Sequence, residues 1–256
     1  MKRVRIIPSL LIQKGGLVKS VRFKDHKYVG DPINAVKIFN EKEVDEIVIL
    51  DISATGEKRA PDMRRIRDIA SEAFMPLGYG GGITSLEEIR TLIGLGVEKV
   101  ILNAAAFANP DLISEGARYI GSQSIVVSMD VKKTLLGKYR VYTLGGSRNT
   151  GLDPVEFAKK MEQAGAGEIL LNSIDRDGTF EGYDSRLIGL VSHAVNIPVV
   201  AIGGASSTED FAAAITAGAS AAAAGSLFVF QRPHRAVLIS YPTQAELKQK
   251  VFEKIK

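Results

Sequence analysis

The 256-residue sequence contains no cysteine and no tryptophan, and it has only three histidines. The absence of cysteine excludes disulfides, thiolate metal sites and a cysteine nucleophile. His26, His193 and His234 do not show the spacing of metal ligands. We therefore expect a protein that works without a metal or another cofactor.

Long apolar runs are missing as well. The stretch after the basic residues Lys2, Arg3 and Arg5 includes Pro8 and ends at Gln13, so it is too short for a membrane span or for the core of a signal peptide. The sequence predicts a cytoplasmic protein with no membrane partner.

Charge of one sign is not concentrated anywhere in the chain. The net charge is +4, and basic residues form only short groups such as Arg64-Arg65 and Lys132-Lys133, without interleaved aromatic residues. This pattern favours a solvated surface around an anionic small molecule over a nucleic-acid interface. We expect a phosphorylated small molecule as ligand and no nucleic acid.

The sequence does contain an internal repeat. Its two copies are offset by 122 residues, the distance in sequence from Glu46 to Glu168. The shift places Glu46-Ile47-Val48-Ile49 on Glu168-Ile169-Leu170-Leu171, Gly81-Gly82 on Gly203-Gly204, Gly96 on Gly218, and Asp31-Pro32 on Asp153-Pro154. Internal repetition constrains architecture strongly. We expect two similar halves, about residues 1–122 and 123–256, within one domain.

Eight short apolar runs recur along the chain. They cover residues 4–11, 47–52, 77–79, 100–102, 125–129, 169–171, 199–202 and 221–224. Their continuous apolarity is typical of parallel strands that are covered on both faces, and residues such as Leu86, Ile89 and Leu92 between them have helical spacing. The sequence predicts an α/β fold, a single (β/α)8 TIM barrel over residues 1–256 that is built from two half-barrels.

Local signals support this register of strands and helices. Asp31-Pro32 and Asp153-Pro154 each combine an N-cap carboxylate with the residue best suited to the first helical position. Residues 84–88 and 206–210 place hydroxyls and acids at two further helix starts. The alternating segment 138–142, which Gly145-Gly146 follows, predicts a small hairpin on the catalytic face.

Glycines after the predicted strands indicate two anion sites, because they let backbone N–H groups approach a phosphate closely. The sites comprise Gly81, Gly82 and Asn103 in the first half, and Gly203, Gly204, Gly225 and Ser226 in the second. Two such cups predict a ligand with phosphate at both ends, or a duplication in which one cup has lost its ligand. The loop at residues 175–179 offers further donors and acceptors, with an Asx-type turn as its alternative interpretation.

Five segments together carry a resemblance: Ile6-Ile7-Pro8, Gly80-Gly81-Gly82-Ile83, Gly121-Ser122-Gln123, Asp175-Arg176-Asp177-Gly178-Thr179 and Gly203-Gly204-Ala205. Over essentially the whole chain, the sequence resembles the cyclase subunit of imidazole glycerol phosphate synthase. The resemblance implies a heterodimer with a glutaminase, which releases ammonia beneath the barrel. The mouth would use this ammonia to cleave and cyclise a ribulose bisphosphate-type precursor into imidazole glycerol phosphate and an aminoimidazole carboxamide ribonucleotide. It also implies that Lys19, Asp177 and Gly178 bind substrate.

The resemblance fails at one catalytic position. The family uses two aspartates as general acid and base, at the ends of strands one and five. Asp130 matches the second, but Leu11 stands at the position of the first and cannot transfer a proton. Losing such a group typically lowers a rate by about 10²- to 10⁴-fold. Asp51 is a candidate substitute with a structural role as its alternative, while Gly16 and Ala104 replace an aspartate and a phosphate-binding hydroxyl of the family.

The opposite end of the predicted barrel keeps its charged residues. Arg5, Glu46, Lys99 and Glu168 fall at the starts of strands one, two, four and six, and they match the ring that, by resemblance, gates ammonia entry. Two cations and two anions can pair mutually, which allows charge at a barrel floor. A salt-bridged plug that only stabilises the fold is the alternative.

The tail at residues 228–242 looks like a branch of the family associated with acetamidino modification of surface-polysaccharide sugars; a cap on the lower or outer barrel is its alternative role. The leading interpretation is a cyclase-like subunit that takes ammonia from a glutaminase and serves amidination of a nucleotide sugar in O-antigen biosynthesis, with a sugar amidotransferase as a further partner. The alternatives are an active cyclase of histidine biosynthesis and a noncatalytic scaffold that activates its glutaminase.

Overall fold

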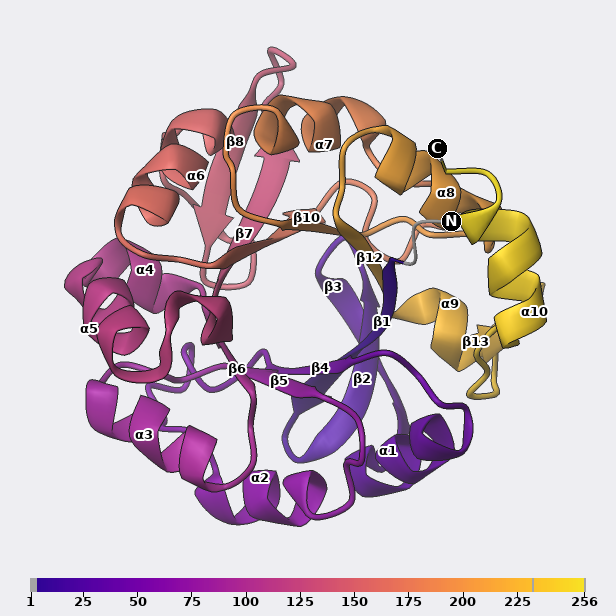
Figure 1. Ribbon diagram of the computed structural model, residues 1–256, viewed down its shortest axis with the longest axis horizontal. Helices are drawn as coiled ribbons and strands as arrows, with labels where there is room; N and C mark the ends of the chain where they lie inside the picture. The colour runs from indigo at the N-terminus through magenta and orange to yellow at the C-terminus, as the bar shows by residue number, and fades with distance from the viewer. Residues whose placement is uncertain (1–3, 232, 256) are drawn as a thin grey trace.

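Eight parallel strands form a closed barrel in the computed structural model of the protein, which describes residues 4–231 and 233–255 (Figure 1). The barrel strands are β1 (Arg5–Gln13), β4 (Ile47–Asp51), β5 (Leu77–Gly80), β6 (Lys99–Leu102), β7 (Ile125–Lys133), β10 (Glu168–Ser173), β11 (Val199–Ile202) and β12 (Ala221–Ala224). Each pairs in parallel with the next, and β12 pairs with β1. The predicted TIM barrel is confirmed. Lys2, Arg3 and Arg232, to which sequence-based expectations extended, lie outside the described residues.

Helices cover the outside of the barrel, as the alternation of apolar runs predicted (Figure 1). The longer ones are α1 (Pro32–Glu41), α2 (Met63–Ala70), α3 (Leu86–Gly94), α5 (Asp111–Ile120), α6 (Pro154–Gln163), α7 (Ser185–Ser192) and α8 (Glu209–Thr216). Short segments are α4 (Ala104–Ala108), η1 (Ser122–Ser124), α9 (Ser226–Val229), α10 (Gln244–Leu247) and the π-helical turn η2 (Lys248–Phe252). Among the described residues, no helix combines the length and apolarity that a membrane crossing requires.

The helix starts follow the sequence signals with one exception. Asp31 and Asp153 accept hydrogen bonds from backbone N–H groups at the starts of α1 and α6, and Ser85 forms a capping box at α3. At α8 the N-cap Thr208 makes no side-chain cap bond. Instead the Asp210 carboxylate accepts from the two backbone N–H groups of residues 206 and 207, so the acid and not a hydroxyl caps this turn.

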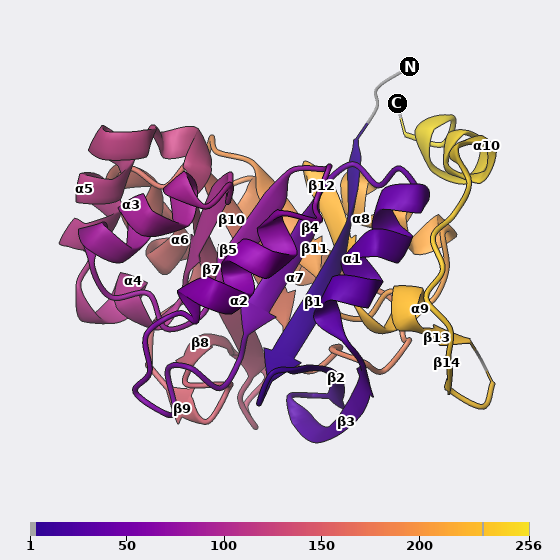
Figure 2. The same cartoon turned by 90° about the horizontal axis from the view of Figure 1, so that it is seen from below.

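Two hairpins rise from the carboxyl ends of the barrel strands, the end that we call the mouth. β2 (Gly16–Val21) and β3 (Lys24–Gly30) follow β1, and β8 (Tyr139–Thr143) and β9 (Arg148–Asn149) follow β7. Both hairpins lie at one end of the molecule, and α10 lies at the other end, which we call the floor (Figure 2). The hairpin predicted at 138–142 is therefore present, as an antiparallel extension of β7.

Apolar side chains form two clusters, one between the barrel and the helices and a smaller one inside the barrel. The interior cluster consists of Ile7, Val48, Ile101, Val126, Leu170, Val200, Ile202, Ala221 and Ala223. Barrel interiors are usually filled by bulky branched residues. Here β12 contributes only alanines, and Gly78 on β5 brings no side chain to the space between Val48 and Ile101. The middle of the barrel is thus lined partly by small residues.

The tail runs along the outer wall. After α9 it forms a small hairpin of β13 (Phe230–Gln231) and β14 (Ala236–Val237). The rings of Phe228 and Tyr241 lie 5.2 Å apart, and the Tyr241 hydroxyl donates to the carbonyl of Ile6 (2.9 Å). Arg235, near the hairpin turn, donates to the carbonyl of Gly178 at the mouth (2.6 Å). The tail therefore braces the wall and the mouth loop after β10.

Candidate functional site

A cavity of about 250 Å³ opens at the mouth, where the carboxyl ends of all eight barrel strands converge. This is the end of the fold at which active sites of TIM barrels are built. The residues that face the cavity include the predicted site residues Lys19, Gly81, Asn103, Asp130, Asp177, Gly178, Gly203, Gly204, Gly225 and Ser226. The fold thus brings together candidates that lie more than 200 residues apart between Lys19 and Ser226.

Asp130 is one of three acids that line this cavity, with Asp51 and Asp177. It lies near the end of β7 with only 9% of its surface exposed, and its Oδ2 accepts a hydrogen bond from Asn103 Nδ2 (3.1 Å). Burial raises the pKa of Asp130 to about 7; the charge of Asp177 raises it further, and the Asn103 hydrogen bond opposes the rise. A carboxyl group with this pKa exchanges a proton readily near neutral pH.

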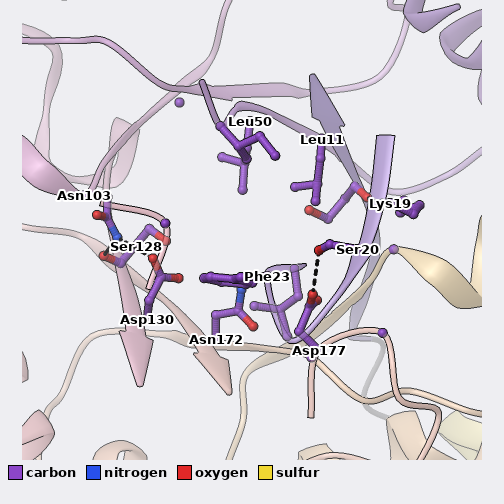
Figure 3. A pocket seen from close by; sticks show the side chains of 18 of the residues that line it. Leu11, Lys19, Ser20, Phe23, Leu50, Asn103, Ser128, Asp130, Asn172 and Asp177 are labelled. Atoms are coloured by element: carbon purple, nitrogen blue, oxygen red, sulfur yellow. Dashed lines mark hydrogen bonds between the residues drawn. The ribbon is translucent and has the colours of Figure 1, made fainter. Parts of the chain in front are cut away.

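Leu11 lies across the cavity from Asp130, beside Leu50 (Figure 3). It belongs to the part of β1 that pairs with both β2 and β4, so its backbone is fixed on two sides. Leu11 and Leu50 make this wall apolar where the resemblance predicts a carboxylate. The predicted loss of the acid at strand one therefore falls inside the cavity.

Asp51 does not replace the missing acid, because its carboxylate is already fully engaged. Oδ1 accepts from the backbone N–H groups of Ser53 and Ala54 and from the Ser53 hydroxyl, at 3.0 to 3.1 Å. Oδ2 pairs with Arg59 Nη2 (2.9 Å). These contacts shape the loop after β4. Of the two interpretations that the sequence left open, the structural role fits the geometry.

Lys19 is a buried cation at the opposite side of the cavity. Its Nζ donates to the carbonyl of Ser9 (2.6 Å) and lies 2.5 Å from the point where a side chain at Gly225 would begin. Burial lowers the pKa of Lys19 to about 8, with the nearby charge of Asp177 acting against this. The ammonium group therefore lies beside Gly225 of the second glycine cup, where a bound anion would stabilise its positive charge.

The hairpin of β2 and β3 is held over the mouth by the loop after β10. Ser20 Oγ donates to Asp177 Oδ2 (3.1 Å), and the backbone N–H of Arg22 donates to the carbonyl of Asp177 (2.9 Å). Burial raises the pKa of Asp177, although Lys19 and Ser20 lower it in part. Gly178 has a φ of 67°, and a side chain there would meet the Ser20 carbonyl at 2.1 Å. Only glycine permits this contact.

Sequence reasoning missed several residues of the cavity, and two of them lie beside Asp130 or Asp177. Phe23, at the turn between β2 and β3, points its ring between Asp130 and Asp177 (Figure 3). Asn172 lies beside Asp130 in the β7–β10 register, and its buried Oδ1 accepts no hydrogen bond from any described residue. A polar residue directly after the apolar run 169–171 was a signal for Asn172. Nothing local indicated that Phe23 would reach the mouth, because that depends on how the hairpin folds back.

The second-half glycines have a backbone conformation that few other residues adopt. Gly203 and Gly204 have φ values of 96° and 110°, which L side chains rarely adopt, and both face the cavity. A Cβ at Gly203 would lie 2.8 Å from the carbonyl oxygen of Ser173. Gly225 and Ser226 complete the rim beside Lys19.

The first-half cup is only partly formed. Gly81 faces the cavity with a φ of 120°. Gly82 does not line the cavity, and a side chain there would meet the carbonyl of Arg59 behind the wall, so its predicted contact with ligand is not supported. Asn103 turns its amide toward Asp130 and the Ser128 carbonyl (3.0 Å), and Ala104 offers no hydroxyl.

A closed ring of four charges forms the floor, as predicted. Arg5 pairs with both Glu46 and Glu168, and Lys99 Nζ lies 2.9 Å and 2.6 Å from the same two carboxylates. Both glutamates are almost fully buried. Burial opposes the charge of Arg5, but the bonds to Glu168 and Glu46 outweigh it and raise the pKa of Arg5 above its usual range. The ring lies directly below the small-residue interior.

Comparison with known proteins identifies the family. The family described as histidine biosynthesis protein matches residues 5–233. A Leptospira interrogans protein, provisionally named imidazole glycerol phosphate synthase subunit HisF, is 48% identical over 98% of this chain and 100% of its own length. This chain belongs to the HisF family of imidazole glycerol phosphate synthase subunits. The provisionally named subunit hisF2 of Pseudomonas aeruginosa is 50% identical over 94% of this chain and 97% of its own length, and HisF of Alkaliphilus metalliredigens is 46% identical over 97% and 96%.

Membership of the HisF family confirms the resemblance that the glycine-rich loops and the segment 175–179 predicted. It also gives Leu11 its significance. The barrel, the mouth cavity and Asp130 are in place, while Leu11 removes a carboxylate from the cavity wall.

Proposed function

We propose that this HisF-family chain takes ammonia from a glutaminase at the floor and conducts it through the barrel to the mouth. There a sugar amidotransferase uses it to form an amidine on a nucleotide sugar for surface-polysaccharide biosynthesis. The observation that carries the proposal is the contrast between the two ends of the barrel: the charged ring at the floor is complete, while Leu11 leaves the mouth with one member of a proton-transfer pair.

The floor ring and the interior support conduction. Ammonia is a base that protonates in water and then lacks a nucleophilic lone pair, so delivery to a distant acceptor favours a dry passage. Above the ring, Gly78, Ala221 and Ala223 reduce the side-chain volume inside the barrel. Arg5 and Lys99 each bridge the two glutamates, so moving one cation opens one side of the ring without leaving a carboxylate unpaired.

The mouth supports a changed chemistry. Asp51 and Asp177 are held by Arg59 and Ser20, which leaves Asp130 as the carboxyl group poised to exchange protons. Lys19 and the second glycine cup remain fit for one phosphate group. A nucleotide sugar or its amidation partner would present such an anion. The bisphosphate precursor of the cyclase reaction needs a second anion site, and the first cup is incomplete.

The test is reconstitution of the three purified proteins: this chain, its glutaminase and the sugar amidotransferase. We expect glutamine-dependent amidine formation only when this chain is present, whereas ammonium chloride at high concentration should support the amidotransferase alone. Equal glutamine-dependent rates with and without this chain would refute the proposal.

An active cyclase is the second candidate function, and one observation favours it: the pKa of Asp130 of about 7 suits a general acid or base. In that case the purified chain should form imidazole glycerol phosphate from the bisphosphate precursor and an ammonium salt. Asp130→Asn should then abolish turnover. Absence of product from the unaltered chain would remove this candidate.

A further inference from the structure

The turn between β7 and β8 is built from residues that turns seldom use. The Gly137 N–H donates to the Thr134 carbonyl (2.9 Å), which makes residues 134–137 a β-turn with Leu135 and Leu136 at its two corner positions. Corner positions favour proline, asparagine, aspartate and glycine, which either preset the backbone or bond to it. Two adjacent leucines at these positions neither preset the backbone dihedral angles nor form hydrogen bonds to the backbone.

These leucines are also fully presented to solvent. Leu135 is 107% exposed and Leu136 is 86% exposed, so they add nothing to the apolar core. The connection between β7 and β8 projects beyond the ring of helices (Figure 1). Single exposed leucines are ordinary, but an adjacent pair at the most prominent point of a rim is the arrangement of an interaction site.

The exposed apolar residues continue from this turn to the mouth cavity. Leu144 follows β8, is 45% exposed and faces the cavity. Leu152, which is 42% exposed, lies beside the middle of β8, where the Val141 N–H donates to its carbonyl (3.1 Å). The four leucines at positions 135, 136, 144 and 152, which we call the leucine rim, thus extend from the cavity edge to the tip of the hairpin.

The hairpin that carries the leucine rim is fixed to the barrel. Tyr139 Oη donates to the carboxylate of Asp184 at the start of α7 (2.9 Å), and Lys133 Nζ lies 3.6 Å from the same group. The Lys133 N–H also donates to Asp175 in the mouth loop (2.8 Å). Anchoring of this kind keeps the tip in one position, which lowers the entropic cost of binding a partner.

We propose that the leucine rim is the docking surface for the ammonia-consuming sugar amidotransferase, which would present an apolar pocket bordered by carboxylates. This inference rests on the proposed function. The mouth is the only end of the barrel from which a partner could collect ammonia without competing with the glutaminase at the floor. Lys132 and Lys138 flank the turn, and neither takes part in an ion pair among the residues that the structure describes, so both can meet an acidic pocket edge.

The test compares Leu135→Asp/Leu136→Asp with Leu190→Asp in the full chain, in complex with its glutaminase. Leu190 is a matched control, because it is 44% exposed on α7 at the outer wall, away from the mouth. We expect the double variant to bind the purified amidotransferase at least tenfold more weakly and to lose glutamine-dependent amidine formation at limiting concentrations. Its glutaminase pairing and glutaminase activity should equal those of the unaltered chain.

Charge is tested separately with Lys132→Glu/Lys138→Glu. Reversal of both charges should slow association several-fold and invert its dependence on salt, because added salt then screens a repulsion between like charges. Unchanged association kinetics would overturn the acidic pocket edge.

Three results would overturn the docking surface. The double variant could bind the amidotransferase as tightly as the unaltered chain, or Leu190→Asp could weaken binding equally. The chain alone could form a dimer that only the double variant dissociates, which would make a second copy the occupant. If the unaltered chain neither binds the amidotransferase nor supports glutamine-dependent amidination, the proposed function itself fails, a result that differs from any of these three.

Discussion

At the scale of single residues, the mouth differs from a two-acid site by one side chain. Asp130 on β7 accepts a hydrogen bond from Asn103, and Leu11 on β1 lies across the cavity beside Leu50. A leucine there keeps the wall apolar and leaves Asp130 without a complementary acid. The residue at position 11 therefore distinguishes a chain that only delivers ammonia, as proposed, from one that also cyclises. Leu11 and Asp130 can each be tested by substitution.

Leu11→Asp should introduce or enhance cyclase activity. A carboxyl group across the cavity from Asp130 supplies the missing proton-transfer group, which is typically worth about 10²- to 10⁴-fold in rate. The measurement is formation of imidazole glycerol phosphate from the bisphosphate precursor and ammonium. Leu11→Asn, which has a similar shape and no ionisable proton, is the control. Equal rates for the two variants would show that position 11 does not limit the chemistry.

Asp130→Asn should stabilise the chain by an amount that grows as the pH rises from about 4 to about 7 and stays constant above that. Because the folded-state pKa is raised from 3.8 to about 7, the folded chain keeps a proton that the unfolded chain has lost, and stability falls as the pH rises through that window. The asparagine variant has no such loss, so above pH 8 its free energy of unfolding should exceed that of the unaltered chain by about 2 to 4 kcal/mol. Urea unfolding of both proteins between pH 5 and 8.5 checks this; a difference that stays constant with pH would contradict it.

At the scale of elements, local sequence signals predicted most of what the structure contains. Apolar runs located all eight barrel strands, and Asp31, Ser85 and Asp153 marked helix starts correctly, because caps depend on bonds within one turn. The position of Phe23 in the cavity and the direction in which Gly82 faces depend on how loops pack against distant segments. The neighbouring residues in the sequence therefore could not predict them.

Gly203→Ala should damage the second glycine cup. Its φ of 96° strains any L side chain, and the new Cβ would lie 2.8 Å from the Ser173 carbonyl, so the loop has to move. Gly151→Ala is the matched control, since Gly151 has a φ of 75° but no atom within 4 Å of the new Cβ. We expect at least a tenfold loss of affinity for a phosphorylated ligand, measured by calorimetry, in the first variant only. Equal affinities would exclude this cup as the phosphate site.

At the scale of the whole molecule, the repeat relates the two halves of the barrel. Gly81 and Gly203 occupy equivalent positions with positive φ, and α1 and α6 begin with the same Asp-Pro cap. The division at about residue 122 into half-barrels of one domain stays a prediction. The repeat alone could not show how the two cups differ, because the difference depends on contacts of Asn103 with the neighbouring strand β7 and of Lys19 with β1.

Gly78→Val should obstruct the interior next to the floor ring. The position lies between Val48 and Ile101, whose side chains would be 3.3 Å from a new Cβ, and beside Lys99, its partner in the β5–β6 register. Overpacking of this kind costs about 1–3 kcal/mol of stability. Glutamine-dependent amidination should fall at least tenfold while glutaminase activity and ammonium-dependent amidination persist. Gly78→Ala is the milder control, and a full rate in Gly78→Val would place the route elsewhere.

The most direct test of conduction through the barrel uses glutamine labelled with ¹⁵N in its amide, supplied to the three-protein complex in the presence of excess unlabelled ammonium. Ammonia that travels from the floor ring to the mouth does not mix with the solvent pool. Conduction through the barrel predicts an amidine product that retains the ¹⁵N label. A product with the isotope ratio of the surrounding solution would contradict it.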